Sequence, residues 1–334
     1  MTNKRATVLG AGAWGTAIAV ILARAGVRTT LGVRRGSQVA LMRQLRENPI
    51  YLPGIRLPDD LELTDRWTDA VDGANVIVMA IPSSHARDAM SAIAPALRPA
   101  ATIVSATKGI EPGSLLTMTA MLCEIAPAVR CAALSGPGFA AEVARGKPTA
   151  LVAAAIDEAT AGTAQELFAG PLLRVYRSTD PIGVELAGTL KNVIAIATGI
   201  GDGLDLGSGA RAAVITRGLA ELTRLGEATG ARRETIAGLA GLGDLVLTCT
   251  GELSRNRAFG IRLARHNDGR IDLEEHEGQP VTEGIANART AVELARRAGI
   301  EMPIVTAVYR VLYEGGSPRA MVEELLNREL KAEF

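Results

Sequence analysis

A glycine-rich turn near the start of the chain constrains the fold more than any other feature. A short apolar run ends at Leu9, residues 10–15 read Gly-Ala-Gly-Ala-Trp-Gly, and an apolar pattern at helical spacing follows. Gly10 permits a tight turn, Gly12 lets a phosphate approach the backbone, and Gly15 lets the helix pack closely on its strand. The free N–H groups at the helix N-terminus then attract a pyrophosphate. These residues predict a dinucleotide-binding unit, against the alternative that the glycines mark an ordinary turn.

Two arginines follow the second predicted strand, residues 28–33. A dinucleotide fold usually places an acidic residue there for the ribose 2′-hydroxyl, but this chain has Arg34 and Arg35. Guanidinium groups favour a 2′-phosphate, so the pair favours NADP without excluding NAD. The alternative is that both arginines are solvated in a loop.

The pattern of strands and helices changes midway along the chain. Strand-like segments recur at 75–81, 102–106, 130–134, 149–153 and 172–176, with helical patterns in most gaps. This alternation predicts a mostly parallel sheet. From about Asp180 onward helical patterns replace the strands, and the clearest are 285–298, 303–314 and 318–328, the last capped by Ser317. We therefore expect an α/β N-terminal Rossmann-like domain at 1–180 and an all-α C-terminal substrate and catalytic domain at 181–334.

Charge balance and cysteine number exclude several classes of protein. Lysine plus arginine equal aspartate plus glutamate at 36 each, which gives no electrostatic footprint for nucleic acid. Three cysteines without metal-type spacing fit a reducing compartment, and His85, His266 and His276 also lack ligand spacing, so we predict no metal site. No apolar run approaches the roughly 20 residues of a membrane span, and no signal-peptide pattern is present. We expect a cytoplasmic protein with no nucleic-acid partner and no membrane insertion.

One lysine lies on a predicted helix among small residues. Lys191, in the helical pattern 181–198, has only alanine, glycine and threonine at helical spacing and no carboxylate three or four residues away. Such a face leaves room for a bound molecule beside the ammonium. Desolvation there would lower the lysine pKa toward the range useful for proton transfer. A lysine at the edge of the core that extends into solvent explains the pattern equally well.

Three further segments offer polar groups, each with a structural alternative. Lys108 follows the strand at 102–106 and can reach a ligand oxygen, although loop lysines are usually solvated. Asp244, after Gly-Leu-Gly, can orient a lysine or bind a hydroxyl, but it is also typical of a helix cap or turn. Residues 254–257, Ser-Arg-Asn-Arg, suit a phosphate dianion in a loop, or form a solvated loop.

Taken together, these segments resemble the bacterial type of NAD(P)-dependent glycerol-3-phosphate dehydrogenase. The likeness covers nearly the whole chain and runs through residues 10–17, 48–54, 107–109, 135–140, 185–192, 241–245, 254–256, 283–284 and 301–304. So many segments in order are more specific than any one of them. The resemblance implies reversible reduction of dihydroxyacetone phosphate to sn-glycerol 3-phosphate by NADH or NADPH, a step that supplies glycerophospholipid synthesis.

The resemblance also implies site residues. It makes Lys191 the catalytic proton donor or acceptor. The implied substrate-binding residues are Lys108, Gly136, Gly138, Lys191, Asp244, Ser254, Arg255 and Asn256. The implied cofactor-binding residues are Gly10, Gly12, Ala13, Trp14, Gly15, Arg34, Arg35, Tyr51, Lys108, Ala140, Arg255, Val281 and Glu283. The family commonly has serine where this chain has Gly138, so a side-chain hydroxyl contact is lost there.

Two other functions share these sequence features. A dehydrogenase acting on a sugar phosphate or a 3-hydroxy acid also uses a dinucleotide domain, a helical domain and a lysine. A cofactor-binding sensor without catalysis would keep the glycine turn, but the presence of both Lys108 and Lys191 disfavours it. Family likeness and the apolar helical half together predict a homodimer. The sequence leaves the preference between NADH and NADPH, and any feedback regulation, open.

Overall fold

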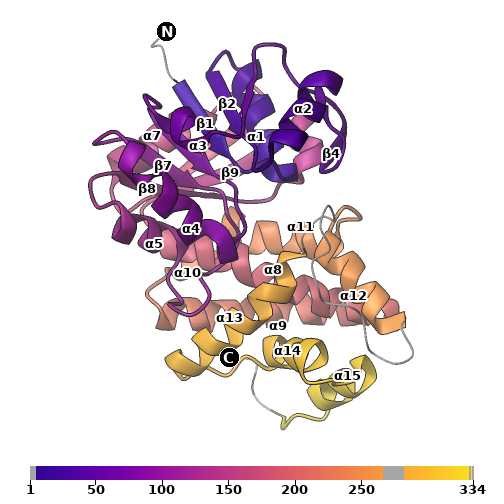
Figure 1. Ribbon diagram of the computed structural model, residues 1–334. Helices are drawn as coiled ribbons and strands as arrows, with labels where there is room; N and C mark the ends of the chain where they lie inside the picture. Colours follow the sequence, from indigo (N-terminus) through magenta and orange to yellow (C-terminus); the bar gives the residue numbers. More distant parts are fainter. Residues whose placement is uncertain (1–4, 266–281, 331, 333–334) are drawn as a thin grey trace.

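The computed structural model describes residues 5–265, 282–330 and 332. These residues form two lobes, a sheet-containing lobe from the first half of the chain and a helical lobe from the second (Figure 1). We call them the sheet lobe and the helical lobe. The fold is an N-terminal Rossmann-like α/β domain followed by a helical C-terminal domain, as the sequence predicts.

The sheet lobe is built on eight strands. They are β1 (Arg5–Leu9), β2 (Arg28–Gly32), β5 (Glu62–Thr64), β6 (Val76–Met79), β7 (Thr102–Ser105), β8 (Arg130–Ser135), β9 (Thr149–Ala154) and β10 (Leu173–Ser178). Their order is β10-β9-β8-β7-β6-β1-β2-β5, and every neighbouring pair is parallel except β8 with β9. The carboxyl ends of β1, β6, β7 and β8 therefore lie at one edge, and the predicted mostly parallel sheet is confirmed.

Helices cover both faces of this sheet. They are α1 (Ala13–Arg24), α2 (Gly36–Leu45), α3 (Trp67–Val71), α4 (Ser83–Ile93), the 3₁₀ turn η1 (Ala94–Ala96), α5 (Met118–Ile125), α6 (Ala140–Ala144) and α7 (Glu158–Phe168). Successive strand residues point to opposite faces. Val8 accordingly packs into one apolar cluster with Ile18 of α1, while Leu9 packs into another with Met90 of α4. Burial on both faces explains why the strands read as continuous apolar runs.

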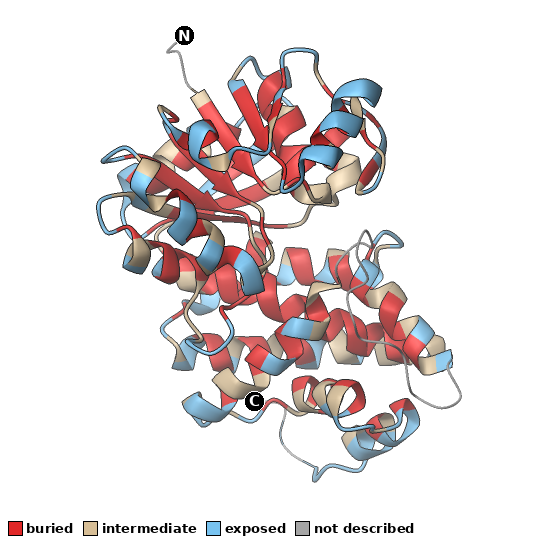
Figure 2. Cartoon of the chain, in the orientation of Figure 1, coloured by how far each residue is buried: buried red, intermediate tan, exposed pale blue. Residues whose placement is uncertain are grey.

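The helical lobe is arranged around one buried helix, α8 (Pro181–Gly203). Around it lie α9 (Gly207–Ala228), α10 (Arg233–Ala237), the π-helical turn η2 (Leu239–Gly243), α11 (Asp244–Thr250), α12 (Arg255–Arg265), α13 (Glu283–Ala298), α14 (Pro303–Tyr313) and α15 (Pro318–Leu326). Figure 2 shows α8 as a buried element inside a shell that is exposed outward. Among the described residues after 180, every regular element is helical.

Local signals account for the ends of several helices. Asp180 caps α8 by accepting the N–H of Gly183 at 2.9 Å, and Ser317 caps α15 by accepting the N–H of Ala320 at 3.0 Å. Gly299 ends α13 with φ +67°, in the left-handed conformation that favours glycine. These stop and start signals place the predicted C-terminal helices within a few residues of the observed ones.

One further element of the sheet lobe lies apart from the main sheet. The strands β3 (Glu47–Asn48) and β4 (Leu52–Arg56) form a small antiparallel hairpin. The sequence did not predict this hairpin or the short strand β5 at the edge of the main sheet. The hairpin matters for the site because it carries Asn48 and Tyr51 next to the glycine turn.

No single helix within the described ranges is both long and apolar enough to cross a membrane. The bent pair formed by 233–250 and 255–265 reaches that length and composition only when both parts are counted together. In the protein, α11 and α12 pack against α8.

Candidate active site

The turn after β1 has the geometry that phosphate binding needs. Gly10 has φ +106°, a conformation that favours glycine. A Cβ on Gly12 would meet nothing within 4 Å, so this residue faces open space, whereas a Cβ on Gly15 would clash with the carbonyl oxygen of Gly10. The first N–H groups of α1, which begins at Ala13, have no partners within the helix. An open space at a helix N-terminus fits a pyrophosphate.

Asn48 holds this glycine turn from the neighbouring hairpin. Its fully buried side chain donates from Nδ2 to the carbonyl oxygen of Ala11 at 2.9 Å and to Oγ1 of Thr16 at 2.8 Å. Its Oδ1 accepts the N–H of Tyr51 at 3.2 Å. Sequence reasoning did not single out Asn48. The available signal was the position of this asparagine in the segment 48–54, which is one of the segments that carry the family resemblance.

A buried carboxylate joins two lysines that come from the two lobes. Asp244, the first residue of α11, accepts from Lys191 Nζ on Oδ1 at 2.5 Å and from Lys108 Nζ on Oδ2 at 2.7 Å. Lys191 also donates to Thr248 Oγ1 at 2.8 Å. Lys191 is 5% exposed and Asp244 is 1% exposed. Lys191 therefore does not extend into solvent, and Asp244 is more than a turn residue.

Burial and neighbouring charges shift the two lysine pKa values in opposite directions. Burial, together with the Lys108 ammonium, lowers the pKa of Lys191 to about 8, although the carboxylate of Asp244 acts to raise it. Burial also acts to lower the pKa of Lys108, but Asp244 and Glu283 outweigh it and hold that pKa above its usual value. Of the two lysines, Lys191 is therefore the one that can exchange a proton near neutral pH.

Lys108 contacts the segment that follows β8. Lys108 Nζ donates to the carbonyl oxygen of Gly136 at 3.4 Å and lies 5.9 Å from the centre of the Trp14 ring. Gly136 has φ +135°, which favours glycine. A Cβ on Gly138 would lie 3.2 Å from Thr149 and 3.3 Å from Val143, so a serine side chain here would press on its neighbours. The structure thus brings the glycine turn, Lys108 and the end of β8 together.

The segment 254–256 begins a helix, so the predicted loop is wrong at this point. Helix α12 starts at Arg255, because Ser254 accepts the N–H of Arg257 at 3.2 Å and acts as a cap. Asn256 is buried, donates to Asn192 Oδ1 at 2.9 Å and accepts the N–H of Gly284 at 2.9 Å. The Arg255 side chain is exposed. A helix N-terminus beside a guanidinium still suits a phosphate.

Asn192, the residue after Lys191, connects this helix start to α13. Its Nδ2 donates to Glu283 Oε2 at 3.1 Å, and Glu283 is the first residue of α13. Sequence reasoning did not assign Asn192 a role, although its position beside Lys191 was a signal. The chain Asn256, Asn192 and Glu283 ties three helices together next to the lysine pair.

The remaining predicted cofactor residues lie in the sheet lobe or outside the described residues. Arg34 and Arg35 are exposed directly after β2, and Ala140 begins α6, which packs on α1. Tyr51 is half-buried in the hairpin. Val281, together with His266 and His276, lies outside the described residues.

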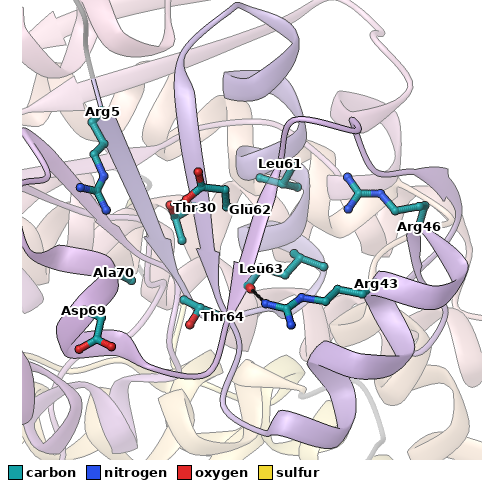
Figure 3. Close-up of a pocket in the computed structure, with 10 residues that line it drawn as sticks. All are labelled: Arg5, Thr30, Arg43, Arg46, Leu61, Glu62, Leu63, Thr64, Asp69 and Ala70. Carbon is teal, nitrogen blue, oxygen red and sulfur yellow. Dashed lines mark hydrogen bonds between the residues drawn. The ribbon is translucent and has the colours of Figure 1, made fainter.

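A separate pocket of about 500 Å³ lies at the β2–β5 edge of the sheet (Figure 3). Within its lining, Thr30 Oγ1 donates to Glu62 Oε2 at 3.1 Å, and Arg43 donates to the carbonyl oxygen of Leu63 at 2.5 Å. None of the predicted site residues lines it.

Comparison with known proteins gives a consistent match over the whole chain. Models of the NAD-dependent glycerol-3-phosphate dehydrogenase N-terminus and C-terminus match residues 5–161 and 180–323. Proteins named as NAD(P)+ glycerol-3-phosphate dehydrogenases from Geobacter sulfurreducens and Citrifermentans bemidjiense are 48% and 49% identical, each over 99% of both chains. The crystal structure of glycerol-3-phosphate dehydrogenase from Coxiella burnetii has a TM-score of 0.91 and 38% identity, covering 98% of this chain and 99% of that one.

Proposed function

This chain belongs to the NAD-dependent glycerol-3-phosphate dehydrogenase family, and we propose that Lys191 is the group that exchanges a proton with its substrate. The enzyme reduces dihydroxyacetone phosphate reversibly to sn-glycerol 3-phosphate with NAD(P)H, which feeds glycerophospholipid synthesis. The observation that carries the lysine assignment is the buried Lys191 ammonium, held by Asp244 and Thr248 beside a second lysine.

Reduction of a ketone requires a proton on the oxygen as negative charge develops there. The bound NAD(P)H supplies the hydride, and the protein supplies orientation and the proton. Asp244 and Thr248 accept two of the three hydrogens of the Lys191 ammonium, which leaves a third for the substrate oxygen. With a pKa of about 8, Lys191 is protonated at neutral pH and can still release its proton. In the oxidative direction the neutral amine takes the proton back.

In this proposal, two groups of residues bind the two ends of the substrate. The phosphate lies at the start of α12, where Ser254, Arg255 and Asn256 offer a helix N-terminus and one guanidinium. Because the Asn256 side chain is engaged by Asn192 and Gly284, its contribution to the phosphate comes through its main chain or through positioning. Lys108, Gly136, Gly138 and Asp244 surround the other polar groups of the substrate.

The cofactor lies along the carboxyl edge of the sheet in this proposal. The pyrophosphate-binding residues are Gly10, Gly12, Ala13, Trp14 and Gly15, and the open space beside Gly12 supports that placement. Arg34 and Arg35 receive the 2′-phosphate of NADPH, and their position directly after β2 supports this role. Tyr51, Lys108, Ala140, Arg255, Val281 and Glu283 complete the cofactor set that the resemblance implies.

We also propose the division of the chain at 180/181, a homodimer and a cytoplasmic location. The division is supported by β10, which ends at Ser178, and by α8, which begins at Pro181. The dimer is supported by exposed apolar side chains on or beside α11 and the two elements that pack against it, α9 and η2, namely Leu206, Leu242, Val246 and Leu253. Free thiols at all three cysteines support a reducing compartment. Sedimentation equilibrium tests the dimer, and cell fractionation tests the location.

Steady-state assays with each cofactor and substrate test the proposed reaction. We expect dihydroxyacetone phosphate to drive oxidation of NADPH, NADH or both, and we expect sugar phosphates and 3-keto acids to give far lower kcat/KM. A protein that binds NADPH but oxidises it with none of these substrates would be a sensor instead of a dehydrogenase.

A further inference from the structure

One buried amide links the main chains of the two segments that carry the lysines. Asn287, on α13, is 2% exposed. Its Nδ2 donates to the carbonyl oxygen of Lys108 at 3.1 Å and to that of Thr189 at 3.2 Å. Thr189 precedes Lys191 by two residues on α8, whereas Lys108 belongs to the sheet lobe. The two hydrogens of a single NH₂ group therefore fix the loop of one lysine against the helix of the other.

The loop that carries Lys108 is packed tightly at the residue that follows the lysine. A Cβ on the next residue, Gly109, would lie 2.5 Å from Ser83 Oγ and 3.3 Å from Asn287 Oδ1. Lys108 is thus attached to the helical lobe twice, by its ammonium to Asp244 and by its main chain to Asn287. The bond to Asp244 alone would hold only the ammonium, at the end of a flexible four-carbon side chain. The bond to Asn287 fixes the main chain from which that side chain extends.

We propose that Asn287 is a positioning residue that holds Lys108 against Asp244 and thereby controls the charge around Lys191. The proposal rests on the proposed role of Lys191 in proton exchange. The Asn287 side chain bonds to main-chain carbonyl oxygens and not to the Lys191 ammonium. It acts on Lys191 indirectly, by fixing the position of Lys108.

The groups facing Lys191 decide the direction of the effect. Asp244, Thr248 and Cys249 face it from α11, and Lys108 faces it from the sheet lobe, while Glu283 of α13 acts on Lys108. The Lys108 ammonium repels the Lys191 ammonium and shares the Asp244 carboxylate with it. If Lys108 moves away, its ammonium repels the Lys191 ammonium less, and the Asp244 carboxylate interacts with Lys191 alone. Both changes raise the pKa of Lys191.

The test is the pH dependence of kcat in both directions for Asn287→Leu, which removes both donors at similar volume. Reduction needs protonated Lys191, so the wild-type rate falls as pH rises through the Lys191 pKa, and oxidation rises over the same range. In the variant we expect both midpoints to move upward by roughly one pH unit. We also expect NADPH affinity, measured by fluorescence titration, to change less than the KM for dihydroxyacetone phosphate.

A control on the same helix separates positioning from general packing. Thr290→Val removes a buried hydroxyl that donates to the carbonyl oxygen of Asn287, at 3.2 Å, without touching the Lys108 loop. We expect its midpoints to match those of the wild type. Asn287→Ala serves as the second variant if the leucine variant does not fold, and it must shift the midpoints in the same direction.

Each outcome bears on the proposal. Unmoved midpoints in a folded Asn287 variant, with only a lower kcat or melting temperature, would overturn it, and so would equal shifts in Thr290→Val. Failure of the proposed function is distinguishable, because it would appear as retained turnover in a Lys191 variant, whatever Asn287 does.

Discussion

Asp244 places one negative charge between two ammonium groups, and Glu283 of α13 adds a second carboxylate that acts on Lys108. Taking charges out of water is costly unless they are paired and hydrogen-bonded, and here each ammonium has a carboxylate oxygen within 2.7 Å. A phosphorylated substrate brings the opposite charge. The two ammonium groups therefore favour an anionic substrate in the proposed site, while burial, together with the Lys108 ammonium, lowers the pKa of Lys191.

The arginine after β2 provides a prediction at the residue scale. Arg34→Asp should weaken NADPH binding on the order of tenfold or more, and it should weaken NADH binding much less, because the new carboxylate repels only the 2′-phosphate. Titration of both cofactors by fluorescence measures this. Arg98→Asp, an equal charge change at another exposed position, should leave both affinities unchanged. Equal losses for the two cofactors in Arg34→Asp would remove Arg34 from the 2′-phosphate site.

The sequence predicted the individual polar groups of the site better than their contacts. Lys191 was recognised as a candidate by the small residues at helical spacing from it, and Asp244 by the glycines that precede it. Their contact joins residues 53 positions apart, and the contact of Asp244 with Lys108 spans 136 positions. No local pattern encodes such distances. Asn48 and Asn287 escaped notice for the same reason, since a buried asparagine is recognised only by the main-chain groups it meets.

At the scale of elements, two buried glutamates hold the N-termini of helices. Glu185 of α8 accepts the N–H of Thr119 at 2.9 Å and also the Thr119 hydroxyl, at the start of α5. Glu221 of α9 accepts the N–H of Ile304 at 2.7 Å and that of Val305 at 3.2 Å, at the start of α14. Burial raises the pKa of each carboxyl to about 7, although the donated hydrogen bonds act to lower it. Glu185 ties the helical lobe to the sheet lobe.

This buried carboxyl predicts a pH dependence of stability. Between an unfolded pKa of 4.5 and a folded pKa of about 7, the native state binds more protons at Glu185 than the unfolded state does. The contribution to stability is therefore fully present below pH 4.5 and is lost as pH rises through about 7. Glu185→Gln keeps the shape without the charge. As pH rises across this window, the free energy of unfolding of the variant should increase relative to that of the wild type by roughly 3 kcal/mol.

Urea unfolding at a series of pH values measures the difference. Glu221 titrates in the same window but is present in both proteins, so its effect cancels. A difference between wild type and variant that stays constant with pH would show that Glu185 does not titrate there.

The elements themselves were largely predictable, and the exceptions have physical causes. Buried parallel strands and helix caps leave strong local signals. Strand β5 has three residues at a sheet edge, too few for a pattern. Helix α8 was expected to end at residue 198, but it continues to Gly203. A Cβ on Gly199 would clash with the carbonyl oxygen of Arg257, so this glycine permits close packing of α12 and does not end the helix.

For the whole molecule, the site exists only where the two lobes meet. Lys108 and the glycine turn come from the sheet lobe, whereas Lys191, Asp244 and Asn287 come from the helical lobe. The sequence predicted both lobes and the family. It did not predict their mutual placement, because that depends on side chains packing across the junction.

The central claim is that Lys191 exchanges the proton, and the turnover of Lys191→Ala tests it most directly. With saturating dihydroxyacetone phosphate and NADPH, we expect kcat to fall roughly 100- to 10,000-fold, NADPH binding to stay nearly intact, and added ethylamine to restore part of the rate. Lys147→Ala, at an exposed lysine paired with Glu142, should match the wild type. A kcat for Lys191→Ala within a few-fold of the wild type would contradict the account.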